Sequence, residues 1–95
     1  MKAVYKVSFP SSEIQENFTF STIAPPGTFE FHFKWLNERW NVWVTFPDGT
    51  IHEAGVYPNV TSWSKRLDYG LKFKTALKNI NFDSLFLTEL YLIEW

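Results

Sequence analysis

Two histidines, His32 and His52, are the side chains of this sequence best suited to metal or proton-transfer chemistry. They could bind a metal ion together if they faced each other across neighbouring strands. A protein metal site needs three or four ligands, however, and the chain has no cysteine and no clear third ligand. We therefore expect two strand residues that face solvent, with no metal and no cofactor.

Carboxylates are the second group that could do chemistry, because a pair of them can act as acid and base. The candidates are scattered along the chain: Asp48, Glu53, Asp68 and Asp83. Their spacing favours no pairing, and Asp48 before Gly49 is typical of a turn. The sequence also lacks a Gly-rich phosphate loop, a serine nucleophile elbow and any Cys nucleophile. We expect no catalytic residues, and a protein that is not an enzyme.

Basic residues gather in the second half of the chain, interleaved with apolar ones: Lys65, Arg66, Lys72, Lys74 and Lys78 alternate with Leu67, Tyr69, Leu71 and Phe73. On a small barrel they could line a groove for single-stranded nucleic acid, with Trp40, Trp43 or Trp63 as stacking platforms. The formal net charge of −1 instead favours a solvated basic face, or one that meets an acidic protein.

Exposed aromatic rings could also bind glycans. For most of the rings a core position is the better interpretation, because their alternation matches a buried strand face. We place Trp35 and Trp43 in the core. Trp40, close to a loop, and Trp95, at the end of the sequence, are the candidates for a partner surface.

The elements that position these residues are predicted to be strands. Ninety-five residues with 45% hydrophobic and 20% aromatic content suit one domain, residues 1–95, with a ring-rich core. Period-two alternation and turn residues such as Pro25-Pro26-Gly27 and Pro47-Asp48-Gly49 delimit the expected strands: Val4–Phe9, Asn17–Ile23, Phe29–Trp35, Trp40–Phe46 and Thr50–Val56. The fold class is all-β, a small antiparallel barrel or sandwich.

The second half of the sequence is harder to assign. One short helix is an alternative to strand or coil between Ser64 and Asn79. Ser84 to Trp95 is a long apolar run, which we interpret as a strand buried on both sides. No segment is long enough to span a bilayer, and the first residues lack the apolar stretch of a secretory signal.

The clearest local feature is a β-hairpin around Leu36–Val44, whose loop holds Asn37 and Arg39. Its pattern of Asn37, Arg39 and Trp43, followed by Asp48-Gly49 and then Gly55, resembles the baseplate plug proteins of contractile-tailed phages, of the cyanophage baseplate hub type. The resemblance spans most of Phe18 to Trp95. It departs at Leu36, where an aromatic is expected, and after Gly55, where a Gly-rich turn is expected.

The resemblance implies a structural protein of the virion, made in the host cytoplasm and placed in the tail baseplate. It would plug the central hub channel and contact hub proteins, the tape-measure protein and copies of itself around the tail axis, without nucleic acid or membrane. We expect Asn37, Arg39, Trp40 and Trp95 at interfaces. Arg39 either stacks on Trp40 or Trp43, or pairs with a carboxylate of a neighbouring subunit. The alternative is a small β-barrel that binds single-stranded nucleic acid or a glycan.

Overall fold

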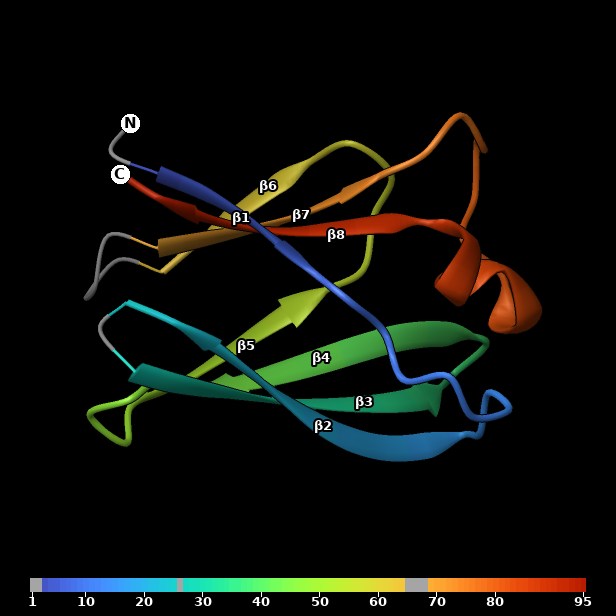
Figure 1. The fold of residues 1–95 in the computed structure, drawn as a ribbon. Helices are drawn as coiled ribbons and strands as arrows, with labels where there is room; N and C mark the ends of the chain where they lie inside the picture. Colours follow the sequence, from blue (N-terminus) through green and yellow to red (C-terminus); the bar gives the residue numbers. More distant parts are fainter. Residues whose placement is uncertain (1–2, 26, 65–68) are drawn as a thin grey trace.

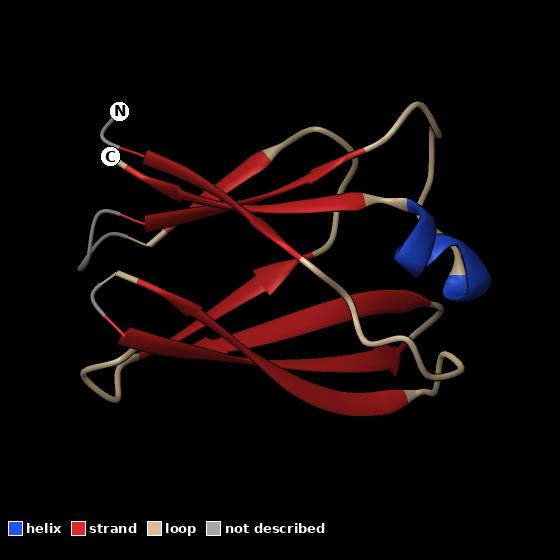
Figure 2. Cartoon of the chain, in the orientation of Figure 1, coloured by secondary structure: helices blue, strands red, loops and turns tan. Residues whose placement is uncertain are grey.

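The chain forms a β-sandwich of two four-stranded antiparallel sheets that do not close into a barrel (Figures 1 and 2). This computed structural model describes residues 3–25, 27–64 and 69–95. It confirms the predicted fold class and selects the sandwich over the barrel. No helix of the described residues is long and apolar enough to cross a membrane.

Sheet B is a simple meander of four consecutive strands. They are β2 (Asn17–Ala24), β3 (Gly27–Leu36), β4 (Arg39–Thr45) and β5 (Ile51–Gly55). All four lie close to the predicted ranges, because each combines period-two alternation with a clear turn signal at its end. The β3–β4 connection is a two-residue loop, since Leu36 pairs directly with Arg39.

Sheet A is assembled from both halves of the sequence, in the order β1-β8-β7-β6. Its strands are β1 (Ala3–Val7), β6 (Thr61–Trp63), β7 (Tyr69–Lys74) and β8 (Glu89–Glu94). The chain crosses between the sheets twice, after β1 and after β5 (Figure 1). β1 and β8, far apart in sequence, therefore become neighbours.

The prediction of a short helix between Ser64 and Asn79 is wrong for the described residues, because the helix that they form comes after that range. The described part of Ser64–Asn79 holds the strand β7 and coil, while a short 3-10 helix, η1, spans Phe82–Leu87. Local hydrogen bonds favour this turn: the Asn81 amide donates to Ser84 Oγ at 2.7 Å, and Thr88 Oγ1 donates to the Leu85 carbonyl at 2.7 Å. Asn, Ser and Thr side chains offer the backbone such local partners in place of a strand ladder.

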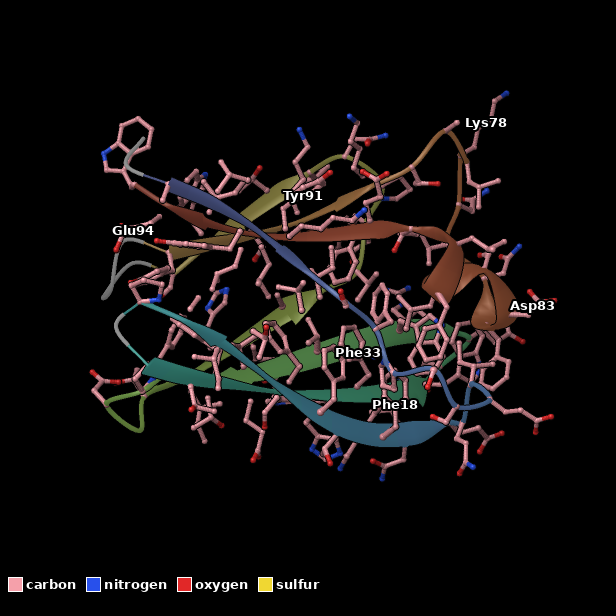
Figure 3. The ribbon with its side chains drawn as sticks, in the orientation of Figure 1. Phe18, Phe33, Lys78, Asp83, Tyr91 and Glu94 are labelled. Carbon is pink, nitrogen blue, oxygen red and sulfur yellow. The ribbon has the colours of Figure 1, made fainter. Side chains whose placement is uncertain are left out.

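The last strand is correspondingly shorter than the predicted Ser84–Trp95, and it is not buried on both sides. Leu90 and Leu92 point into the core, whereas Glu89 and Tyr91 lie on the outer face of sheet A. In Figure 3 the labelled Tyr91 side chain points away from the sandwich.

Aromatic rings fill the space between the sheets. Phe29, Phe31 and Phe33 are fully buried, and Figure 3 shows Phe18 and Phe33 between the two layers. Phe18 and Phe33 stack with ring centroids 5.2 Å apart. Each such ring removes a large apolar area from water, which lets a chain of this length form a core.

Candidate functional site

The loop of the β3–β4 hairpin is exposed and has an unusual backbone. Asn37 and Glu38 both have positive φ, 53° and 60°. Two-residue hairpin loops of the type I′ class require positive φ at both central positions, and Asn tolerates that conformation well. Asn37 is thus at the tip of an exposed turn, where a partner could reach it.

Arg39 is exposed at the start of β4. It lines a shallow cavity of about 250 Å³ whose other walls include Tyr57 and Asn79. In the described part of the chain, the cation placed over the Trp43 ring is Lys34, with Nζ 5.7 Å from the centroid. Arg39 therefore borders a surface recess, and Lys34 rather than Arg39 covers the Trp43 ring.

The predicted positions of the two tryptophans of β4 are both wrong, because Trp40 is buried and Trp43 is on an outer face. Trp40 was expected at a partner surface but is 1% exposed, with its indole N–H directed at the carbonyls of Asn81 and Phe82, 3.2 Å from each. Trp43 was expected in the core but lies half-buried on the outer face of sheet B. Trp40 is part of the core and cannot serve as an interface residue of the folded chain.

Trp95 is exposed, as an interface residue must be, with 64% of its surface accessible. It meets Trp63 edge to face, with centroids 5.8 Å apart and planes at 83°. Trp63 lies against Gly70 of β7, where a Cβ atom would come within 2.8 Å of the indole ring. The two tryptophans form an aromatic pair at one end of the outer face of sheet A.

Lysines and a tyrosine occupy the middle of that face. Tyr91 of the central strand β8 has Lys6 of β1 on one side and Lys72 of β7 on the other. Glu89 faces Lys74 and accepts a hydrogen bond from the Tyr91 hydroxyl. That hydrogen bond, followed by the charges of Lys6 and Lys74, lowers the pKa of Glu89, and the same bond raises the pKa of Tyr91. Three lysines against one carboxylate leave this region positive.

Apolar side chains and recesses continue the same surface. A cavity of about 260 Å³ lies between Val4, Tyr91 and Ile93, and another of about 570 Å³ is lined by Leu77 and Leu87. Lys74 lines both cavities. We call the whole surface the sheet A face; it comprises Val4, Lys6, Trp63, Lys72, Lys74, Leu77, Leu87, Glu89, Tyr91, Ile93 and Trp95.

The sequence anticipated only part of this surface. Lys72 and Lys74 are brought together as predicted, while Lys65 and Arg66 lie outside the described residues and Lys78 is on a neighbouring loop (Figure 3). Lys6 and Tyr91 were missed. The alternation of Glu89, Tyr91, Ile93 and Trp95 is a signal that could have identified one face of β8.

The candidate catalytic residues are not brought together. His32 and Asn17 hydrogen-bond at 2.6 Å on the outer face of sheet B, whereas His52 points between the sheet edges toward Ser62 Oγ, 3.3 Å away. His52 is directly opposite the buried Val44 and is half-buried, so it is not on the solvent face as predicted. This burial lowers the pKa of His52. Within residues 3–25, 27–64 and 69–95, no group of three or more His, Cys, Asp or Glu side chains could hold a metal ion.

The described members of the carboxylate set, Asp48, Glu53 and Asp83, belong to three separate segments. Asp48 accepts a hydrogen bond from the Thr50 amide at 2.9 Å, in the turn role that the sequence predicts. Asp83 is exposed on η1, Glu53 is exposed on β5, and Asp68 lies outside the described residues. The sheet A face is therefore the strongest functional candidate.

Comparison of the chain with protein-family models, with curated protein sequences and with solved structures gives no match.

Proposed function

We propose that this protein is a non-enzymatic structural component that docks into a larger assembly through the sheet A face. The observation that carries the proposal is the contrast between the outer faces of the two sheets. The sheet A face combines Trp63, Trp95 and Tyr91 with three lysines. Aromatic residues are enriched at the centres of protein interfaces and carry much of the binding energy there.

The outer face of sheet B is more polar, which supports assigning the contact to sheet A. Most of its side chains are hydroxyls, amides and charges: Asn17, Thr19, Ser21, Thr28, Glu30, His32, Lys34, Arg39, Asn41, Thr45 and Glu53. The apolar exceptions are Ile23, Leu36, Ile51 and Trp43. Trp43 is the large ring among them and is partly covered by Lys34. Such a face suits contact with water.

The resemblance of the Asn37-Arg39-Trp43 region to phage baseplate plugs supplies the specific form of the proposal. The assembly would be a contractile-tail baseplate in the virion, with the protein plugging the central hub channel. Its partners would be hub proteins and the tape-measure protein. Asn37 and Arg39, exposed at one end of the sandwich, would add contacts beside those of the sheet A face.

The test is binding of the purified protein to hub proteins of the same phage. We expect a complex, and we expect Trp95→Ser to weaken it at least tenfold, because truncating a tryptophan that acts as an interface hot spot costs about 2 kcal/mol or more. Ile51→Ser, which removes a comparably exposed apolar side chain from sheet B, is the matched control. No binding by the unmodified protein, or equal losses in both variants, would reject the proposal.

A second candidate function is binding of single-stranded nucleic acid on the same face. It is favoured by the position of Tyr91 between Lys6 and Lys72, which is a stacking ring flanked by two cations. Titration with oligonucleotides at several salt concentrations tests it, because true phosphate contacts give an affinity that falls steeply with salt. A glycan would instead stack on a free ring and bind with little salt dependence.

A further inference from the structure

β2 is an edge strand of sheet B that lacks the usual protection against pairing with another chain. It pairs with β3 on one side, and Figures 1 and 2 show no strand beside it on the other. An edge strand leaves alternate N–H and C=O groups without a ladder partner. β2 is also eight residues long, with the sequence Asn-Phe-Thr-Phe-Ser-Thr-Ile-Ala, which contains no charge, no proline and no glycine.

The other three edges each carry a feature that hinders such pairing. β6 has three residues and β1 has five, with Lys6 on the latter. β5 carries Glu53 and is joined to the edge of sheet A through the contact between His52 and Ser62. Short strands and charged side chains are the means by which natural proteins protect edges. β2 alone among these edges is both long and uncharged.

We propose that β2 pairs antiparallel with β2 of a second copy of this chain in solution. A two-fold axis perpendicular to the sheet, near Phe20 or Ser21, joins the two B sheets into one eight-stranded sheet. This arrangement keeps both cores on the same side, so that Phe18 and Phe20 of each copy lie on the inner surface. On the outer surface of the joined sheet, Thr19, Ser21 and Ile23 of one copy lie beside the same three residues of the second copy.

The chemistry of β2 favours a second copy as the occupant. Two identical strands with charged residues would place like charges opposite each other, which is unfavourable, but β2 brings none. Hydroxyl and β-branched residues opposite one another stabilise antiparallel pairs. Ile23, which is 84% exposed, would be covered by the added strand. The pairing is confined to one edge, so the dimer dissociates on dilution.

The proposal does not depend on the function proposed above. The proposed dimer has two-fold symmetry and is not the ring of copies around a tail axis. The dimer is therefore a state of the free protein before it enters an assembly. A strand of a different protein could use the same edge, and the experiment below separates that case because it uses the purified chain alone.

Sedimentation velocity of the purified protein over a range of concentrations tests the pairing. We expect a concentration-dependent dimer, and slower hydrogen exchange at alternate β2 amides as concentration rises. Ile23→Lys places a charge on the edge without removing a buried side chain, and it should make the protein monomeric. Ser21→Lys, closer to the proposed axis, should do the same.

Ile51→Lys is the matched control, because Ile51 is an exposed isoleucine on β5, at the opposite edge of the same sheet. It should leave the dimer unchanged. A protein that is monomeric at every concentration would overturn the proposal. So would a dimer that persists in both β2 variants, or one lost in Ile51→Lys, because the contact would then lie elsewhere.

Discussion

At the scale of single residues, Trp40 and Trp43 show how one loop length decides a side chain's environment. With a two-residue loop at Asn37-Glu38, Trp35 is opposite Trp40, and directly opposite residues share a face of the sheet. Trp40 therefore follows the buried phenylalanines of β3 into the core. The sequence indicates a loop here but does not fix its length, and a shift of one residue in the register turns every side chain of a strand to the other face.

Replacing Trp40 by Phe tests its buried position. The variant keeps a ring but leaves the carbonyls of Asn81 and Phe82 without the indole donor, so we expect the free energy of unfolding to fall by about 1–3 kcal/mol. Trp43→Phe, on the outer face, should change it by less than about 1 kcal/mol. Urea denaturation followed by circular dichroism measures both, and equal losses would contradict the assignment.

The Trp63 ring covers Gly70 and leaves little room for a side chain there. Gly70→Ala places a methyl group within 2.8 Å of both Trp63 and Thr61, and we expect a loss of about 1–3 kcal/mol from this crowding. In the Trp63→Ala background the same substitution should cost less, because one of the two obstructing groups is gone. A double-mutant cycle on the free energy of unfolding measures the difference, and simple additivity would show that the ring does not rest on Gly70.

At the scale of elements, the β3–β4 hairpin contains a local strain that can be relieved. Glu38 has a φ of 60°, a left-handed conformation that costs a non-glycine residue roughly 1–2 kcal/mol. Glu38→Gly should therefore raise the free energy of unfolding by up to about 1 kcal/mol, since Asn-Gly is the preferred sequence for this turn. Glu30→Gly, in the body of β3, should lower it by roughly 0.5–1 kcal/mol. Thermal unfolding of the two variants compares them, and a destabilised Glu38→Gly protein would be the opposite result.

The elements also differ in how far the sequence determines them. β2 to β5 were predictable because alternation and turn residues agree for each strand. β7 was not assigned, because the alternation within the six residues Tyr69–Lys74 is too short to distinguish strand from coil. η1 was missed because its stability depends on side-chain hydrogen bonds at Asn81, Ser84 and Thr88, which periodicity does not reveal.

At the scale of the whole molecule, the sequence predicted an antiparallel β fold but not the surface that we assign to function. The sheet A face is built from all four strands of sheet A together with Leu77 and Leu87. Lys6 reaches Tyr91 only because the two ends of the described chain pair. Neither spacing nor composition reports such a long-range register. The interface candidates drawn from local sequence, Asn37 and Arg39, are exposed at the hairpin end, and Trp95 lies on the sheet A face.

A contact between the two sheets makes the stability of the fold fall at alkaline pH, and this fall can be measured. Tyr69 of sheet A packs against Phe29 of sheet B, with centroids 5.4 Å apart, and its hydroxyl donates to Glu94 at 2.9 Å. Burial first, and then the bond to Glu94, raise the pKa of Tyr69 from 10.0 to about 12. The raised pKa means that the folded state favours the neutral phenol of Tyr69. The contribution of this phenol to the free energy of unfolding is therefore complete below pH 10 and is lost as the pH rises through about 12.

The variant Tyr69→Phe tests this fall in stability at alkaline pH. Its free energy of unfolding should decline less between pH 10 and 12 than that of the unmodified protein. Chemical denaturation at a series of pH values measures the decline. An absorbance titration of both proteins shows whether a late-titrating phenol is lost with Tyr69, since Tyr91 also has a raised pKa. Parallel declines in the two proteins would show that Tyr69 does not contribute.

The pairing of β1 with β8 has a consequence for synthesis on the ribosome. Sheet B joins neighbours in sequence and can form as soon as β5 has emerged, but β1 has no partner until β8 is made. At translation rates of roughly 5–20 residues per second, that delay is on the order of several seconds. During this interval the uncharged edge of β2 and the still unpaired β1 are exposed together in the nascent chain. The order of the strands thus makes the half-made protein, rather than the finished one, the form most in need of protection by a chaperone.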